Sequence, residues 1–429
     1  MTAPCVPQPA ESLGADFVQK RESISVPPES PKLMKQNQGQ TSRFKVYFPP
    51  HEDLFMKTIL PVALLIILTA VAVGQEPSDR QGGFLLGAAH VGIGFGHVDR
   101  VNGIRFNWSD DGFDFVNGIN FTLWRPADRP WNGTINGLAL GVVAPAAEEI
   151  HGLAITPGVV LTHQHMIGVG LGGLALVSNG SVTGVNAGGL AIVAEENVQG
   201  ISFGGLGLVS QKDMIGVNVA GLGTVAQGRA IGFSFAGLGT VSQGDMIGIN
   251  LAGLGTVSQG NMTGLNFAGL GTVSQGDLGG ISIAGLGTVA NGAARGINIG
   301  GIAVVAQRGI SGFSFGAAAI VSKEAIKGVN LTVGQLQSNV SISGLNTGLY
   351  KIDAPSISGI NVGLVWTESD NLSGFTISGY NRTFEMQRGI VIGLLNHTAD
   401  LFGLQIGLLN IVESNDPPFR YLPLLNFRF

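Results

Sequence analysis

The sequence contains a single cysteine, Cys5, in 429 residues. One cysteine excludes an internal disulfide framework and a thiolate metal cluster. Charged residues make up only 12% of the chain and aromatic residues only 7%, whereas about 25% of an ordinary protein is charged. The low charge excludes a disordered polyelectrolyte, and the net charge of −5 provides no basic surface for nucleic acid. Packing and hydrogen bonding must therefore hold the fold together.

Glycine is abundant, with 68 residues, and it recurs at a fixed period. A glycine stands at every sixteenth position from Gly152 to Gly344, and looser spacings extend the series back to Gly103 and forward to Gly403. The five copies within Ile215–Ala294 are nearly identical. A unit this short cannot bury its own apolar face, so neighbouring units must stack to form a core.

Each unit contains two short β-patterns. In one copy, Ile249–Ala252 alternates apolar and small or polar residues, and Leu254–Ser258 carries β-branched residues. The periodic glycine is interpreted as a corner, and Gly253 and Gly260 as corners that accept a positive φ. The sequence therefore predicts an all-β fold, a β-solenoid of about 20 rungs with 16-residue repeats.

The direction of the side chains is a separate prediction. Apolar residues are expected to point inward, and polar residues to point outward or to form ladders between rungs. In the copy that starts at Gly248 the inward set is Ile249, Leu251, Leu254 and Val257, and the other set is Asn250, Thr256 and Ser258. Asn, Ser or Thr usually stands two positions after the periodic glycine, and stacked amides can hydrogen-bond from rung to rung.

An outer-membrane β-barrel is the alternative fold, with one strand and a turn in each unit. The chain ends in Phe429 with apolar residues at alternate positions before it, which resembles the C-terminal signal of bacterial outer-membrane proteins. The scarcity of aromatic residues inside the repeats and the exposed glycines on the apolar face weigh against this alternative.

The chain divides into five parts. Residues 1–55 are expected to be disordered or an over-extended reading frame that precedes a true start at Met56, and residues 56–74 match a signal peptide or a membrane anchor. Small residues at Ala72 and Gly74 place a cleavage site before Gln75. The rest is interpreted as entry strands with an N-terminal cap (75–102), the repeat array (103–411) and a C-terminal aromatic cap (412–429).

The last repeat units carry a resemblance. Gly389–Asn396 and Gly403–Asn410 resemble the G-L-Q-I-G-L-x-N repeat of a family of exported bacterial surface-repeat proteins. The central copies depart from it, because Gly-Thr-Val-Ser replaces the second half. The resemblance implies a cell-envelope location and carries no catalytic residues to transfer.

No catalytic, cofactor-binding or metal site is predicted. His163 and His165, with His151 one rung earlier, form the only histidine cluster, but no carboxylate recurs beside them at ligand spacing. The acidic segment Ser109–Asp114 has closely spaced oxygen ligands that suit a weak calcium site, without the periodic recurrence of calcium-binding β-rolls. The acidic pairs Glu148-Glu149 and Glu195-Glu196 are interpreted as solvated corners.

One regular array suggests a specific minor alternative. Thr240/Ser242, Thr256/Ser258 and Thr272/Ser274 form a T-x-S pattern on successive rungs. If the valine between them points inward, the hydroxyls form a flat grid that resembles the surface of some ice-binding solenoids. Polysaccharide binding is the other minor alternative.

The sequence thus predicts an exported, non-enzymatic repeat protein with a structural or interaction role at the cell surface or outer membrane of a bacterium. Its partner is expected to be an envelope component, a polysaccharide or a protein, with membrane association left open. No nucleic acid and no cofactor are expected.

Overall fold

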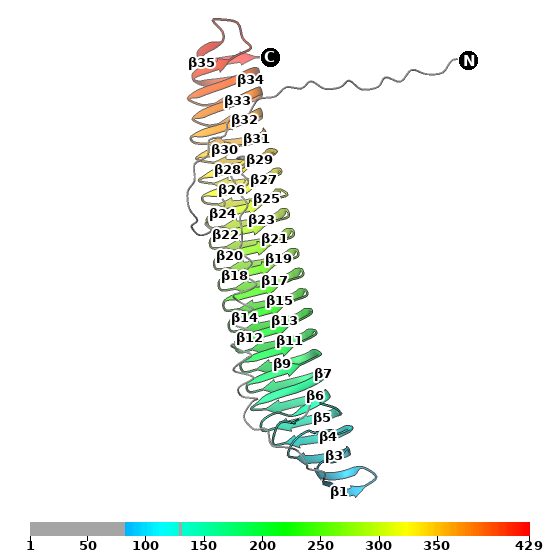
Figure 1. The fold of residues 1–429 in the computed structure, drawn as a ribbon. Coiled ribbons are helices and arrows are strands. Elements are labelled where there is room, and N and C mark those ends of the chain that lie inside the picture. The colour runs from blue at the N-terminus through cyan, green and yellow to red at the C-terminus, as the bar shows by residue number, and fades with distance from the viewer. Residues whose placement is uncertain (1–81, 128–130) are drawn as a thin grey trace, which may run out of the picture. The chain divides into compact units, whose positions relative to one another are not determined.

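The computed structural model describes residues 82–127 and 131–429. These residues form an all-β solenoid of about 19 turns with a sixteen-residue spacing (Figure 1). The predicted fold class is confirmed. The segments 1–55 and 56–74, together with their predicted disorder and signal or anchor role, lie outside the described residues.

Each turn of the central array contains one long and one short strand, and each strand pairs in parallel with its counterpart in the next turn. The long strand β17 (Met246–Ala252) pairs with β15 (Ala230–Ala236) and β19 (Met262–Ala268). The short strand β18 (Gly255–Ser258) pairs with β16 (Gly239–Ser242) and β20 (Gly271–Ser274). The barrel alternative, with one strand in each unit, is therefore wrong.

The strands of the long ladder, including those that extend through both ladders, are these: β1 (Gly83–Ala88), β2 (Val91–Gly96), β3 (Arg100–Asn107), β4 (Phe115–Thr122), β5 (Thr134–Gly141), β6 (Ala146–Thr156), β7 (Val159–Gly172), β9 (Ser181–Gly188), β11 (Val198–Gly204), β13 (Met214–Ala220), β15, β17, β19, β21 (Leu278–Ala284), β23 (Ala294–Gly300), β25 (Ile310–Gly316), β27 (Ile326–Thr332), β29 (Ser341–Gly348), β31 (Ser356–Gly363), β32 (Trp366–Ile377), β33 (Tyr380–Ile392), β34 (Leu395–Val412) and β35 (Tyr421–Arg428). The short ladder consists of β8 (Ala175–Ser178), β10 (Ala191–Ala194), β12 (Gly207–Ser210), β14 (Gly223–Ala226), β16, β18, β20, β22 (Gly287–Ala290), β24 (Ala303–Ala306), β26 (Ala319–Ser322), β28 (Gln335–Ser338) and β30 (Lys351–Asp353).

The two ends of the solenoid differ from its middle. At the N-terminal end β1 pairs antiparallel with β2, and at the C-terminal end β35 pairs antiparallel with β34. An antiparallel strand at each end occupies backbone groups that a further turn would otherwise bond. Figure 1 shows β1 and β35 at opposite ends of the stack.

The orientation prediction is wrong. Asn250, Thr256 and Ser258 are buried, at 0 to 1% exposure, whereas Ile249 is 38% and Leu254 is 47% exposed. Sixteen residues enclose an interior only a few side chains wide, so this turn buries one large residue, Met246, beside small or polar side chains, and its other large apolar residues are left outside. The expected polar ladder does exist, but it lies in the interior.

The corner interpretation is corrected in part. Gly253 and Gly260 lie in turns as expected, but neither has a positive φ. The positive φ belongs to the periodic glycines inside the long strands, such as Gly248 at +121°. A Cβ on Gly248 would lie 2.0 Å from the carbonyl oxygen of Gly232 in the preceding turn. The period is therefore kept by a backbone contact between turns that only glycine permits.

Candidate functional surface

Two columns of large apolar side chains cover the outside of the long-strand ladder, and we call them together the apolar face. One column stands one position after each periodic glycine and the other three positions after it, and the antiparallel end strands β1 and β35 continue both columns through their paired residues. The residue between them, such as Asn218, Ser234 or Asn250, is buried. Because side chains alternate along a strand, both columns point outward.

Strand pairing keeps the two columns in register over the whole stack. The first column contains Leu86, Ile93, Ile104, Ile119, Leu138, Leu153, Val169, Val185, Ile201, Val217, Phe233, Ile249, Leu265, Ile281, Ile297, Phe313, Val329, Leu345, Ile360, Phe375, Ile390, Leu404 and Phe427. The second contains Phe84, Phe95, Phe106, Phe121, Leu140, Ile155, Leu171, Ala187, Phe203, Val219, Phe235, Leu251, Phe267, Ile283, Ile299, Phe315, Leu331, Thr347, Val362, Ile377, Ile392, Ile406 and Leu425. Only Ala187 and Thr347 depart from a large apolar side chain.

The apolar face is open to solvent. Phe203, Phe235 and Phe267 are 46%, 41% and 38% exposed. A row of turn leucines beside them, from Leu206 to Leu286, is 40 to 49% exposed. The largest apolar patch on an ordinary monomer covers about 300 to 600 Å², and this face continues over every turn of the array. Exposed apolar patches above that size are typical of interaction sites.

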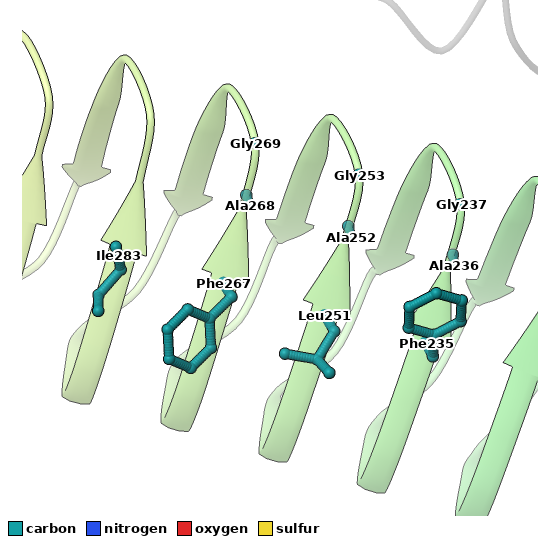
Figure 2. A pocket seen from close by; sticks show the side chains of 10 residues that line it. All are labelled: Phe235, Ala236, Gly237, Leu251, Ala252, Gly253, Phe267, Ala268, Gly269 and Ile283. Carbon is teal, nitrogen blue, oxygen red and sulfur yellow. The ribbon is translucent and has the colours of Figure 1, made fainter.

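A shallow groove crosses the middle of the apolar face, with a volume of about 270 Å³. Phe235 and Phe267 stand two turns apart, with the shorter Leu251 between them. Figure 2 shows these side chains and Ile283 projecting from the same side of four neighbouring strands. Ala252 and Gly253 lie at the adjoining turn, where they leave room beside the aromatic rings. The groove can hold one apolar side chain of a partner.

The interior is largely polar in the central turns. The Asn250 amide donates to Asn266 over 2.9 Å, and Asn330, Asn346 and Asn361 continue the same kind of ladder at 3.0 and 2.9 Å. Where serine replaces asparagine the ladder is weakened, and Asn266 reaches the Ser282 hydroxyl only at 3.4 Å. The amide atoms of Asn186 and Asn218 have no hydrogen-bond partner within the protein.

Inner serines connect the short strands to the turns. The hydroxyls of Ser242, Ser258 and Ser274 donate to backbone carbonyls of the preceding turn over 2.7, 2.8 and 2.9 Å. Together with Thr240, Thr256 and Thr272 these serines are buried at 0 to 1% exposure. The prediction that these T-x-S residues form a surface grid is therefore wrong, because their hydroxyls are buried and not exposed to solvent.

Charged side chains gather at the turn between the short strand and the next long strand. Oxygens of Asp245, Asn261 and Asp277 each accept the backbone N–H sixteen residues further along, at 2.7 to 2.9 Å. The N–H of Ala293 holds the pKa of Asp277 below its usual value, with help from Arg295 and Arg308. These contacts stabilise the turn, and they assemble no reactive group.

The predicted acidic segment folds around a buried ion pair. Asp110 and Arg105 are both fully buried and lie 3.0 Å apart. Asp110 also accepts from Asn107, Asn120 and Thr122, at 2.6 to 2.9 Å. Burial lowers the pKa of Arg105, and its contact with Asp110 opposes that effect. Because its oxygens already have these donors, Asp110 has a structural role in the first turns.

The remaining carboxylates of this segment also have protein partners. Asp111 accepts the hydroxyl of Ser109, and Asp114 pairs with Arg100 at 2.7 Å.

The histidines and acidic pairs lie on the outside of the early turns. His151 contacts Glu149 at 3.2 Å, and His163 contacts Asn179 at 3.3 Å. Glu196 pairs with Lys212 at 2.5 Å, and that hydrogen bond lowers the pKa of Glu196. Within residues 82–127 and 131–429, no group of three His, Cys, Asp or Glu side chains is placed to hold a metal ion.

Sequence reasoning missed the apolar face. The signal was present: the two outward columns mostly vary from Val to Phe between copies, whereas the position between them is Asn, Ser or Thr in every turn from Asn186 to Thr376. Residues facing solvent tolerate changes of volume that a closely packed interior does not.

Comparisons with known protein families, with curated proteins and with solved structures gave no match. Among the described residues, no helix is long and apolar enough to cross a membrane.

Proposed function

We propose that this chain is an exported, non-enzymatic repeat protein of a bacterial cell envelope, in which the solenoid holds the apolar face as an interaction surface. The observation that carries the proposal is the apolar face itself. Its exposed columns persist over the whole array, although most of the buried side chains between them are small or polar. The packing of the thin interior does not require large apolar side chains on the outside of the strands. Their presence in nearly every turn therefore supports binding of a partner to this face.

Export is supported by the sequence of residues 56–74, which has a lysine followed by an apolar run and small residues before Gln75. The resemblance of Gly389–Asn396 and Gly403–Asn410 to exported surface-repeat proteins supports the same location. N-terminal sequencing of the protein recovered from fractionated cells tests it. A chain that begins at Gln75 in an envelope or extracellular fraction supports export, and recovery from the cytosol with residues 56–74 intact contradicts it.

A non-enzymatic role is supported by the arrangement of the charged groups. The buried pair Arg105–Asp110 is held by neighbouring donors, and the outer acids at Glu196, Asp213 and Asp277 pair with basic side chains. The groove over Leu251 is lined only by apolar side chains and glycine. General acid–base chemistry needs a titratable group within hydrogen-bond distance of the bound molecule, and this groove provides none.

The interaction role is tested by changing one side of the solenoid at a time. In the first variant Phe203, Phe235 and Phe267 are replaced by threonine. The matched control replaces Val241, Val257 and Val273, which point outward from the short strands, by threonine. Association with the envelope fraction should fall only in the first variant, and an equal effect of the two variants would contradict a role for the apolar face.

A further inference from the structure

We propose that the apolar face pairs with the same face of a second copy of this chain, so that two solenoids lie antiparallel in a symmetric dimer. The inference rests on the proposed function, because it names the partner of the interaction surface. The symmetry axis would lie in the interface, along the strand direction, at the level between Phe235 and Leu251.

The first argument is the fit of the second column onto itself. Eleven paired positions run from Phe84 to Phe235, and twelve more run from Leu251 to Leu425 of β35, which pairs with Ile406. An axis between Phe235 and Leu251 therefore overlaps every position of the column except Leu425, and in a symmetric interface each contact occurs twice.

The second argument is the placement of the phenylalanines at that register. Phe235 faces Leu251 of the other copy, and by the same counting Phe203 faces Ile283 and Phe267 faces Val219. No phenylalanine in either column then faces another phenylalanine. A shift of one turn breaks this pattern, because Phe235 would meet either itself or Phe267. The alternation of large with smaller side chains therefore selects this register over its two neighbours, with all but one position of the column overlapped.

The groove provides the third argument. At this register the ring of Phe235 from one copy enters the groove between Phe235 and Phe267 of the other, over Leu251. The symmetry repeats the insertion in the opposite direction. A central aromatic side chain in an apolar recess is the usual form of an interface hot spot.

The extent of the face suits a stable dimer. About 19 turns with a rise of about 4.8 Å each, and about four residues across the face at about 3.3 Å each, give roughly 1,200 Å² for each copy. A standard interface buries about 800 Å² on each partner.

The columns carry no basic residue and the chain has a net charge of −5, whereas helices that lie on lipid surfaces are rich in Lys and Arg. A second copy therefore fits this face better than a lipid surface.

Sedimentation velocity of the purified chain over a range of concentrations tests the dimer. We expect a dimer for the unchanged chain and an at least 30-fold weaker dimer for Phe235→Asp, since hot-spot residues contribute about 2 kcal/mol or more. Val241→Asp, on the short-strand side of the same turn, is the control and should remain dimeric. Circular dichroism and hydrogen exchange verify that both variants are folded.

Cross-linking tests the register. In a chain with Cys5→Ser, the single variants Phe203→Cys and Ile283→Cys should form a disulfide with each other when mixed. Phe203→Cys alone should not cross-link to itself, and such a product would indicate a parallel arrangement and overturn the proposal.

If sedimentation velocity shows the unchanged chain to be a monomer, the proposed dimer is rejected at every register. If that monomer still requires Phe203, Phe235 and Phe267 to bind phosphatidylcholine vesicles or the envelope fraction, the proposed function survives and only the second copy is rejected. If substitutions on the apolar face change neither oligomeric state nor binding, both proposals fail.

Discussion

Alanine at a periodic glycine should destabilise the solenoid, whereas alanine at the glycine beside it should not. Gly280 and Gly279 are consecutive residues of β21. Gly280 has a φ of +92°, and a Cβ there would lie 2.3 Å from the carbonyl oxygen of Gly264. The nearest atom to a Cβ on Gly279 is the Thr263 hydroxyl oxygen at 3.7 Å. Both substitutions add one methyl group to a glycine of the same strand. They differ only in the backbone conformation at that glycine and in the space available to the methyl group.

The magnitude follows from two contributions. Holding a non-glycine residue in this backbone region costs about 1 to 3 kcal/mol. Inserting a methyl group into a filled contact costs about 1 to 3 kcal/mol more. Gly280→Ala should therefore lower the free energy of unfolding by about 2 to 6 kcal/mol. Gly279→Ala should leave it unchanged or raise it by about 0.4 to 1 kcal/mol, because alanine restricts the unfolded chain.

Urea-induced unfolding of both variants measures the difference. Hydrogen exchange should place the weakening of Gly280→Ala at the amides of β19, β21 and β23, since the turns contact only their neighbours. Equal unfolding curves for the two variants would refute the explanation that a contact between successive periodic glycines sets the sixteen-residue period.

Three further outcomes concern the interior and the charged turns. Asn346→Ala removes two buried hydrogen bonds between side-chain amides and should lower the free energy of unfolding in urea by about 2 to 3 kcal/mol. Asn186→Ala, whose amide has no hydrogen-bond partner, should lower it less. Equal losses in the two variants would contradict a stabilising ladder. Arg105→Met should destabilise the first turns by about 3 to 5 kcal/mol, because it leaves Asp110 unpaired. Hydrogen exchange in the first turns should then be faster, and unchanged exchange would contradict a stabilising role of this ion pair. Asp277 has a lowered pKa, so its stabilisation is complete above its ordinary value of 3.8 and is lost as the pH falls through the lower value in the folded protein. Asp277→Asn should consequently melt earlier than the unchanged chain at pH 7 and approach it at pH 2, and a pH-independent gap would contradict the assignment.

The sequence sufficed for the architecture because the period is a backbone property. Glycines at a fixed spacing, short β-patterns and a small polar residue two positions after each glycine together define a stack of turns with an internal ladder. The strands, the turns at Gly253 and Gly260 and the stacked amides at Asn250 and Asn266 follow from these features.

The direction of the side chains could not be read from hydrophobicity. A strand that alternates apolar and polar residues fits either direction equally well, and the usual preference for an apolar interior favoured the wrong one. Volume favours the opposite direction at this position, because a turn of sixteen residues has room inside for few large side chains, such as Met246. From Asn186 to Thr376 the equivalents of position 250 are Asn, Ser or Thr, whereas Val217, Phe233 and Ile249 differ widely in size at one outward position.

Labelling of single cysteines by a maleimide tests the reversed orientation most directly. In a Cys5→Ser chain, Leu254→Cys and Ser258→Cys place a thiol on one turn, at positions that are 47% and 0% exposed. The native protein should react rapidly at position 254 and slowly at position 258, and both should react alike in urea. Rapid labelling at position 258 with protection at position 254 would contradict the polar interior and the apolar face together.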